Sequence, residues 1–309
     1  MGPTASGKTG VALELARHFP LEIVSVDSAL DYRHMDIGTA KPDLATRLQV
    51  PHHLIDIIDP TESYSAAQFC DDALEAMRGI CGRDRVPLLT GGTMLYFKAL
   101  QEGLANLPAA DADIRMVIDG MALETGWPAI HRELERIDPA TAERVDPNDA
   151  QRIQRAMEIF YLTGKPMSEL IASGKSASPP YRLIRIALVP GERAVLHQRI
   201  AARFEEMLEL GLINELRVLR EDYDLNPSLP SMRCVGYRQT WQFLDGEFGL
   251  ASLREKAVAA TRQLAKRQLT WLRAMPDVQT FDCLDEGLAE KIANWLRTQE
   301  LGGSCIPRQ

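Results

Sequence analysis

The residues best suited to chemistry lie at the start of the chain, where the sequence reads GPTASGKT. Gly2, Gly7, Lys8 and Thr9 fit the pattern G-x-x-x-x-G-K-[ST], in which backbone N–H groups curl around an anion. The lysine supplies a positive charge, the threonine can bind Mg²⁺, and the following helix adds its dipole. A chance glycine-rich turn is the alternative. The pattern predicts a site for a phosphate-bearing ligand, but any diphosphate satisfies it as well as ATP does.

Two further polar segments follow predicted strands. Asp27 and Ser28 stand at the end of the strand expected over 21–27, and Gly91, Gly92 and Thr93 end the strand expected over 86–92. In open α/β sheets ligands bind at these carboxyl ends, so all three motifs are expected to meet in one crevice. Asp27 there is a general base, a Mg²⁺ second-shell group or a turn cap. Thr93 donates a hydrogen bond to phosphate, caps the helix that follows it, or does both.

Strands and helices alternate in the first third of the chain, which predicts a mostly parallel sheet with helices on both faces. A further strand is expected at 52–58. The expected helices cover 8–18, 65–82 with Ser65 as N-cap, and a segment from Thr93 onward. A phosphate loop also needs a strand before it, and only Met1 precedes Gly2. A missing N-terminal segment is the favoured explanation, because a missing central strand leaves two unpaired edges.

The pattern becomes purely helical after Pro108 and returns to a strand at 181–190, after a linker-like GKSASPP at 174–180. Helices are then expected at 192–209, 211–222 and 248–275, with a last strand at 278–282. The fold class is therefore α/β, a P-loop-type, mostly parallel sheet flanked by helices, with an all-helical insertion domain. The expected core comprises 1–108 and 179–309, and the insertion comprises 109–178.

The composition is that of a soluble globular protein, with 45% hydrophobic and 25% charged residues in 309. No membrane span and no secretory signal are expected. The five cysteines form no C-x-x-C pair, which predicts free thiols in a reducing cytosol and no zinc site. The net charge of −8 argues weakly against nucleic-acid binding, but local basic faces decide such contacts.

Two basic clusters stand out against this acidic background. Residues 256–276 contain five basic residues and no acidic one, and three of them share one side of the expected helix: Arg262, Lys266 and Arg273. The expected insertion carries Arg152 and Arg155 one turn apart. These faces indicate phosphate-backbone contacts or, with even odds on charge alone, merely solvated helix surfaces. Trp271, between two leucines, is expected in the core.

Several stretches together resemble the tRNA dimethylallyltransferases. The matching motifs span nearly the whole chain in the family's order: GPTASGKT, VDSALDYRHMDIGTAKP, GGTMLYFKAL, NDAQRIQRAMEI, RFEEMLELGLINEL, RCVGYRQTW and ATRQLAKRQLTWLR. The resemblance implies transfer of a dimethylallyl group from dimethylallyl diphosphate to N6 of adenosine 37 in tRNA, in the cytoplasm, with Mg²⁺ as cofactor. It also implies that the helical insertion grips the anticodon stem-loop. No protein partner is indicated, and a monomer is expected.

The resemblance also implies roles for individual residues. Asp27 matches the general base, and Thr93 matches a diphosphate and tRNA contact. The phosphate-loop pattern itself makes Lys8 the third catalytic candidate, as a cation beside the leaving diphosphate, and Thr9 the candidate Mg²⁺ ligand. The implied diphosphate cradle is Gly2, Pro3, Thr4, Ala5, Ser6, Gly7, Lys8 and Thr9. The implied tRNA contacts are Asp27, Ser28, Ala29, Leu30, Thr93, Arg115, Gln151, Arg152, Ile153, Gln154, Arg155, Arg233, Cys234, Val235, Gly236, Tyr237, Arg238, Lys266, Arg267, Gln268, Leu269, Thr270, Trp271, Leu272 and Arg273.

Leu30 departs from the family, many of whose members have glutamine there. Three alternatives share the phosphate loop: a small-molecule nucleotide kinase, a prenyltransferase acting on free adenine nucleotides, and a nucleotide-gated binding module. The acid-free basic stretch and the large insertion argue against the first two, and a binding module leaves Asp27 and Thr93 without a purpose.

Overall fold

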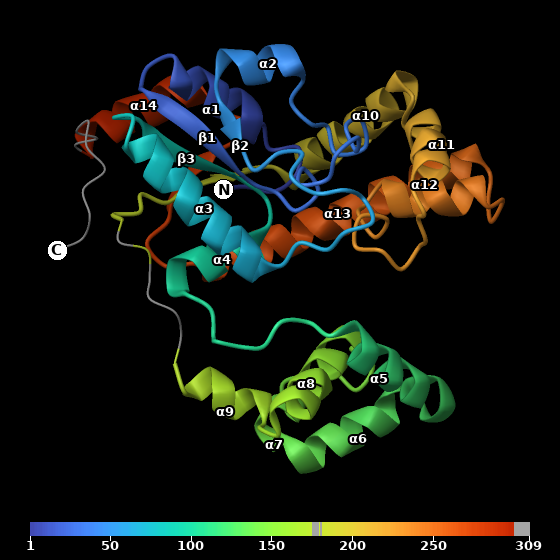
Figure 1. Ribbon diagram of the computed structural model, residues 1–309. Helices are drawn as coiled ribbons and strands as arrows, with labels where there is room; N and C mark the ends of the chain where they lie inside the picture. Colours follow the sequence, from blue (N-terminus) through green and yellow to red (C-terminus); the bar gives the residue numbers. More distant parts are fainter. Residues whose placement is uncertain (175–178, 180, 300–309) are drawn as a thin grey trace. The chain divides into compact units, whose positions relative to one another are not determined.

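The computed structural model describes residues 1–174, 179 and 181–299 and divides the chain into two compact units (Figure 1). The first unit comprises Met1–Ala99 and Pro180–Gln309, and the second comprises Leu100–Pro179. The second unit encloses the predicted insertion 109–178. The linker expected at 174–180 lies mostly outside the described residues.

The first unit is built on a parallel sheet of three strands in the order β2-β1-β3. Leu21 and Ile23 of β1 share core clusters with residues of α1, and α3 also contacts the strand. Helix α14 packs on α1. The bounds are α1 Lys8–Ala16, β1 Leu21–Val26, β2 His52–His53, α3 Ala66–Cys81, β3 Val86–Gly91, α4 Met94–Glu102 and α14 Leu288–Thr298. The predicted parallel sheet between helices is confirmed.

A second parallel sheet pairs β4 (Ile186–Val189) with β5 (Gln279–Asp282). Met1 extends along β4, because its amino group donates to the carbonyl of Ile186 at 2.8 Å and its carbonyl accepts from the N–H of Leu188 at 2.9 Å. The phosphate loop, which follows Met1, thus begins beside β4. Among the described residues, the strands form these two sheets where the sequence predicts one.

Four helices complete the first unit: α10 (Arg193–Leu210), α11 (Leu212–Asp222), α12 (Tyr237–Leu244) and α13 (Leu250–Ala274). They enclose a core that also takes in Tyr32 and Met35, from the segment after β1. That segment includes α2 (Leu44–Gln49), and its packing places the residues following Asp27 against the helices. Helices α12 and α14 were not expected from the sequence.

The described residues of the second unit form five helices, α5 to α9, around a core of their own. Its two 14-residue helices are capped by aspartates: Asp111 accepts from two backbone N–H groups at the start of α5, and Asp149 accepts from one at the start of α8. Glycine ends both helices. The bounds are α5 Ala112–Thr125, α6 Trp127–Ile137, α7 Pro139–Ala142, α8 Ala150–Thr163 and α9 Met167–Ala172.

Two sequence expectations are wrong in this fold. The strand expected over 52–58 shrinks to the two residues of β2, because Leu54 and Asp56 adopt φ angles of 59° and 58°. Cys81 is disulfide-bonded, whereas Cys70, Cys234 and Cys283 are free as expected. Within the described part of the chain, no helix is both long and apolar enough to span a bilayer.

Candidate active site

The phosphate loop has the backbone geometry of an anion-binding nest. Ala5 and Gly7 adopt left-handed φ angles of 61° and 78°, which turn successive N–H groups toward one side. Helix α1 begins at Lys8, so the N–H groups of its first turn have no acceptor within the helix. The loop thus offers several N–H donors and a helix dipole to an anion.

Lys8 lies folded over this loop. Its ammonium donates to the carbonyl of Pro3 at 2.6 Å. Burial lowers the pKa of Lys8 to about 8, the negative charge of Asp27 acts in the opposite direction, and the positive charge of Arg203 lowers it further. The charges of Lys8, Asp27 and Arg203 therefore act on one another in a single region.

Asp27 stands directly after β1, as predicted. Its Oδ1 accepts a hydrogen bond from the N–H of Ala29 at 3.2 Å, which is the turn-capping role that the sequence left open. Among the described residues, no hydrogen bond is recorded for Oδ2. Capping one turn through Oδ1 is therefore compatible with proton transfer through the other oxygen.

Thr93 brings the end of β3 to the end of β1. Its Oγ1 accepts from the N–H of Ser28 at 2.9 Å and donates to the Ser28 hydroxyl at 3.2 Å. A Cβ on Gly91 would lie 1.9 Å from the carbonyl oxygen of Val26, so only glycine permits this approach of the two strands. The two predicted strand-end motifs are thus in direct contact.

Arg203 is a residue of this region that sequence reasoning missed. It extends from α10, donates to the carbonyl of Thr39 at 3.2 Å and is largely buried, which lowers its pKa. The negative charge of Asp27 partly offsets that effect. The stretch RFEEMLELGLINEL contributed to the resemblance, but no local spacing marks one arginine as part of a site.

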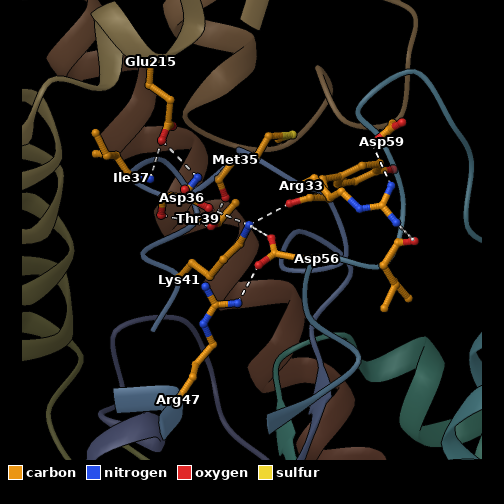
Figure 2. Close-up of polar contacts among 12 residues, drawn as sticks. Arg33, Met35, Asp36, Ile37, Thr39, Lys41, Arg47, Asp56, Asp59 and Glu215 are labelled. Atoms are coloured by element: carbon orange, nitrogen blue, oxygen red, sulfur yellow. Dashed lines mark hydrogen bonds and ion pairs between the residues drawn. The ribbon is translucent and has the colours of Figure 1, made fainter. Parts of the chain in front are cut away.

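The segment after Asp27 is fixed by a lysine at the centre of a polar network (Figure 2). The side chain of Lys41 is only 1% exposed and donates to the carbonyl of Tyr32 at 2.7 Å. It also pairs with Asp36 at 2.7 Å and with Asp56 at 2.5 Å, and Arg47 binds the second oxygen of Asp56. Such paired charges hold a segment with little regular structure in one conformation.

Glu215 of α11 holds the same segment from the other side (Figure 2). Its Oε2 accepts from the N–H groups of Asp36 and Ile37 at 3.0 and 2.7 Å, and its Oε1 accepts from Gly38 at 3.2 Å. The hydroxyl of Tyr237 donates to Oε1 at 2.5 Å. Tyr237, an implied tRNA contact, is therefore fully buried with its hydroxyl bonded inside the unit.

The implied tRNA contacts divide by exposure. The exposed side chains, which are available to a large ligand, are Gln151, Arg152, Arg233, Arg238, Lys266, Arg267, Thr270, Trp271 and Arg273. The buried residues are Ile153, Gly236, Tyr237, Gln268, Leu269 and Leu272. The expectation that Trp271 lies in the core is wrong, because its side chain is 38% exposed with the Lys98 ammonium 5.7 Å from the ring centroid.

In the second unit, two implied tRNA contacts bind a buried glutamate. Arg115 donates to both carboxylate oxygens of Glu158, and Arg155 donates to Oε2 of Glu158 and to the carbonyl of Pro108. Burial acts to raise the pKa of Glu158, but the hydrogen bonds from the two arginines outweigh it and hold the pKa below its usual value. Arg152, in contrast, is exposed and pairs only with Asp149 among its described neighbours.

The residues near the loop suit Mg²⁺ but do not enclose it. Within the described residues, no group of three or more His, Cys, Asp or Glu side chains can hold a metal. Mg²⁺ commonly uses one or two protein oxygens and takes the rest from substrate phosphates and water. The exposed Thr9 hydroxyl and the Asp27 carboxylate are oxygen donors of this kind, so the set fits a metal that arrives with a diphosphate.

Comparisons with known proteins agree with this geometry. The IPP transferase family model matches residues 31–275. The chain is 58% identical over 301 residues to a tRNA dimethylallyltransferase of Nitrosomonas eutropha, covering 97% of this chain and 95% of the relative. It is 59% identical over 296 residues to the enzyme of that name from Nitrosospira multiformis, covering 96% and 92%.

Two solved structures are also similar. A tRNA isopentenylpyrophosphate transferase from Bacillus halodurans has a TM-score of 0.70 and 37% identity, covering 96% of this chain and 94% of that one. A eukaryotic dimethylallyltransferase acting on tRNA has a TM-score of 0.81 and 27% identity, covering 100% and 80%. The family model and the relatives therefore show that this chain is a transferase and belongs to the IPP transferase family.

Proposed function

We propose that the chain transfers a dimethylallyl group from dimethylallyl diphosphate to N6 of adenosine 37 in tRNA. The observation that carries the proposal is the meeting of the phosphate loop with a carboxylate and a threonine hydroxyl that follow the adjacent strands β1 and β3. The names of the relatives supply the acceptor class, and the motif resemblance supplies the position in tRNA.

Asp27 is the general base of this proposal. An exocyclic adenine amine is a poor nucleophile, because its lone pair is delocalised into the ring. As the new N6–C1 bond forms, the C1–O bond to diphosphate breaks and the diphosphate leaves with the electron pair. The amine proton passes to an Asp27 carboxylate oxygen, which restores the neutral amine.

The phosphate loop stabilises the leaving group. An allylic carbon tolerates positive charge, so the barrier lies largely in releasing the diphosphate anion. The N–H groups of the loop and the Lys8 ammonium are oriented before the charge develops, which is the most effective form of electrostatic catalysis. Thr9 would hold Mg²⁺ together with the diphosphate, and the ion would supply additional neutralisation of the leaving group's charge.

The exposed basic residues of α13 suit the phosphate backbone of a stem-loop. Arg262, Lys266 and Arg273 lie on one side of that helix and are all exposed. The target base must leave its stack to reach Asp27, and the contacts to the backbone offset the cost of unstacking.

The direct test is incubation with dimethylallyl diphosphate, Mg²⁺ and unmodified tRNA, followed by nucleoside mass analysis. The expected product is N6-(dimethylallyl)adenosine, with diphosphate released in equal amount. The Asp27→Asn variant should lose about 10²–10⁴ in single-turnover rate and keep its tRNA affinity within a few-fold. Steady tRNA-stimulated ATP hydrolysis without prenyl transfer would instead support a kinase-like function.

A further inference from the structure

A buried glutamine on α13 connects the two loops that form the diphosphate site. Gln268 is 7% exposed, and its Oε1 accepts from the N–H of Thr4 in the phosphate loop at 2.8 Å. Its Nε2 donates to the carbonyl of Gly92, after β3, at 2.9 Å. These contacts join residues separated by 264 and 176 positions in the sequence.

The two partners require the chemistry of a primary amide. The N–H of Thr4 needs an acceptor, and the carbonyl of Gly92 needs a donor. Only one orientation of the Gln268 amide serves both. A carboxylate of the same size would serve Thr4 but oppose the Gly92 carbonyl, and an apolar side chain would serve neither.

Gly92 is matched to Gln268 in shape. A Cβ at Gly92 would lie 2.4 Å from Nε2, so any larger residue there would displace the glutamine. The same Cβ would lie 3.6 Å from the carbonyl oxygen of Gly2. The phosphate loop and the turn after β3 are therefore neighbours, and Gln268 occupies the position that fixes their spacing.

The neighbours of Gln268 on α13 point elsewhere. Lys266, Arg267 and Thr270 are exposed, whereas Gln268 is buried with both polar ends of its amide engaged inside the unit. One helix thus carries two functions on two sides. The exposed side is available to tRNA, and the buried side contacts the donor loops.

We propose that Gln268 is a positioning residue for the prenyl diphosphate rather than a contact to tRNA. It holds the amide of Thr4 and the carbonyl of Gly92, so that the phosphate loop and the segment leading to Thr93 keep the separation that a diphosphate requires. This inference rests on the proposed function for the identity of the donor, but not for the binding of a diphosphate.

The test compares Gln268→Met, which removes both hydrogen bonds, with Gln268→Glu, which keeps only the acceptor for Thr4. The expected result for Gln268→Met is a rise in the KM for dimethylallyl diphosphate of about 10- to 100-fold, because small misplacements of a site cost that much. Its tRNA dissociation constant should stay within about 2-fold, since each lost phosphate contact would cost more than that. Gln268→Glu should likewise raise the KM for dimethylallyl diphosphate and leave the tRNA dissociation constant within about 2-fold.

Two variants on the same helix serve as controls. Gln263→Met changes an exposed glutamine and should leave both constants unchanged, whereas Arg267→Gln should weaken tRNA binding and leave the donor KM unchanged. A loss of tRNA affinity in Gln268→Met with an unchanged donor KM would overturn the proposal. Thermal unfolding of every variant identifies a general loss of structure. If Gln268→Met shows such a loss, the test rests on Gln268→Glu, which retains the size of the side chain and the hydrogen bond to Thr4.

Titration with inorganic diphosphate separates the two proposals. If the wild-type protein transfers no prenyl group but binds diphosphate, and Gln268→Met weakens that binding, the proposed function fails and the role of Gln268 stands. If the wild-type protein transfers normally and Gln268→Met and Gln268→Glu bind diphosphate as well as wild type does, the role of Gln268 fails alone.

Discussion

The hydroxyl of Thr93 accepts the N–H of Ser28 at 2.9 Å, which ties the end of β3 to the end of β1 directly beside Asp27. The bond spans 65 positions of sequence. It adds a side-chain contact to the backbone hydrogen bond from the N–H of Thr93 to the carbonyl of Val26 at 3.1 Å. Thr93 therefore fixes the backbone at Ser28, next to the proposed base Asp27. This role is separate from any contact that its hydroxyl makes with substrate.

Removal of that hydroxyl should impair transfer more than it impairs folding. Thr93→Val keeps the shape of the side chain and should lower kcat/KM for the donor by about 10- to 100-fold. The lost hydrogen bond should lower the free energy of unfolding by only about 1 kcal/mol. Thr93→Ser keeps the hydroxyl and should retain most of the activity. Full activity in the Val variant, together with a loss in the Ser variant, would show that the methyl group, not the hydroxyl, is what matters.

The pH dependence of donor use should report the ionisation of Lys8. Burial lowers the pKa of Lys8 to about 8, so its positive charge is lost as the pH rises through that value. The kcat/KM for dimethylallyl diphosphate should therefore fall above about pH 8, because the free enzyme loses the cation that binds the diphosphate. In Lys8→Arg the guanidinium remains charged, so whatever activity is left should show no such fall. The same alkaline fall in both proteins would exclude Lys8 as its source.

The sequence predicts the parts of the site that depend on local spacing. The phosphate loop is visible because its motif adjoins a predicted helix, and Asp27 and Thr93 are visible because they follow predicted strands. The capping box of Ser65 and Gln68 fixes the start of α3 in the same way.

The missed contributions depend on contacts between distant segments. Arg203, Glu215 and Gln268 act through partners more than 160 positions away, so no window of sequence contains both ends. Trp271 was wrongly placed in the core because its leucine neighbours suggested an apolar stretch, whereas the turn of the helix puts Leu269 and Leu272 inside and Trp271 outside. The sequence also could not reveal the left-handed residues that end β2.

The folding stability should depend on a buried carboxyl next to the site. Asp31 is 1% exposed, its Oδ1 has no hydrogen-bond partner among the described residues, and Tyr96 approaches its Oδ2 only at 3.4 Å. Burial, and after it the charge of Asp27, raises the pKa of Asp31 to about 8. Between about pH 4 and pH 8 the folded chain therefore keeps a proton that the unfolded chain releases, so raising the pH costs stability.

Asp31→Asn should remove this dependence, because an amide does not titrate. The difference in free energy of unfolding between variant and wild type should shift in favour of the variant from pH 5 to pH 8, by at most about 1.4 kcal/mol per pH unit. Urea unfolding of both proteins at the two pH values measures it. A difference in free energy of unfolding that is the same at pH 5 and pH 8 would mean that Asp31 is ionised in the folded protein at both pH values.

Neutralising the basic side of α13 should weaken tRNA binding in a salt-dependent way. In the triple variant Arg262→Gln, Lys266→Gln, Arg273→Gln, each lost phosphate contact should reduce the log–log slope of affinity against salt by about 0.7–0.9. The donor KM should remain unchanged, since all three side chains are exposed on the helix that carries the buried Gln268.

A second triple variant separates this local effect from the change in net charge. Arg17→Gln, Arg78→Gln, Lys291→Gln removes the same number of charges from exposed positions at the C-cap of α1, on α3 and on α14. Filter binding across a range of salt concentrations should give this control the wild-type slope. A control slope that falls as far as that of the α13 variant would mean that tRNA responds to the overall charge, and that the basic side of α13 is a solvated surface.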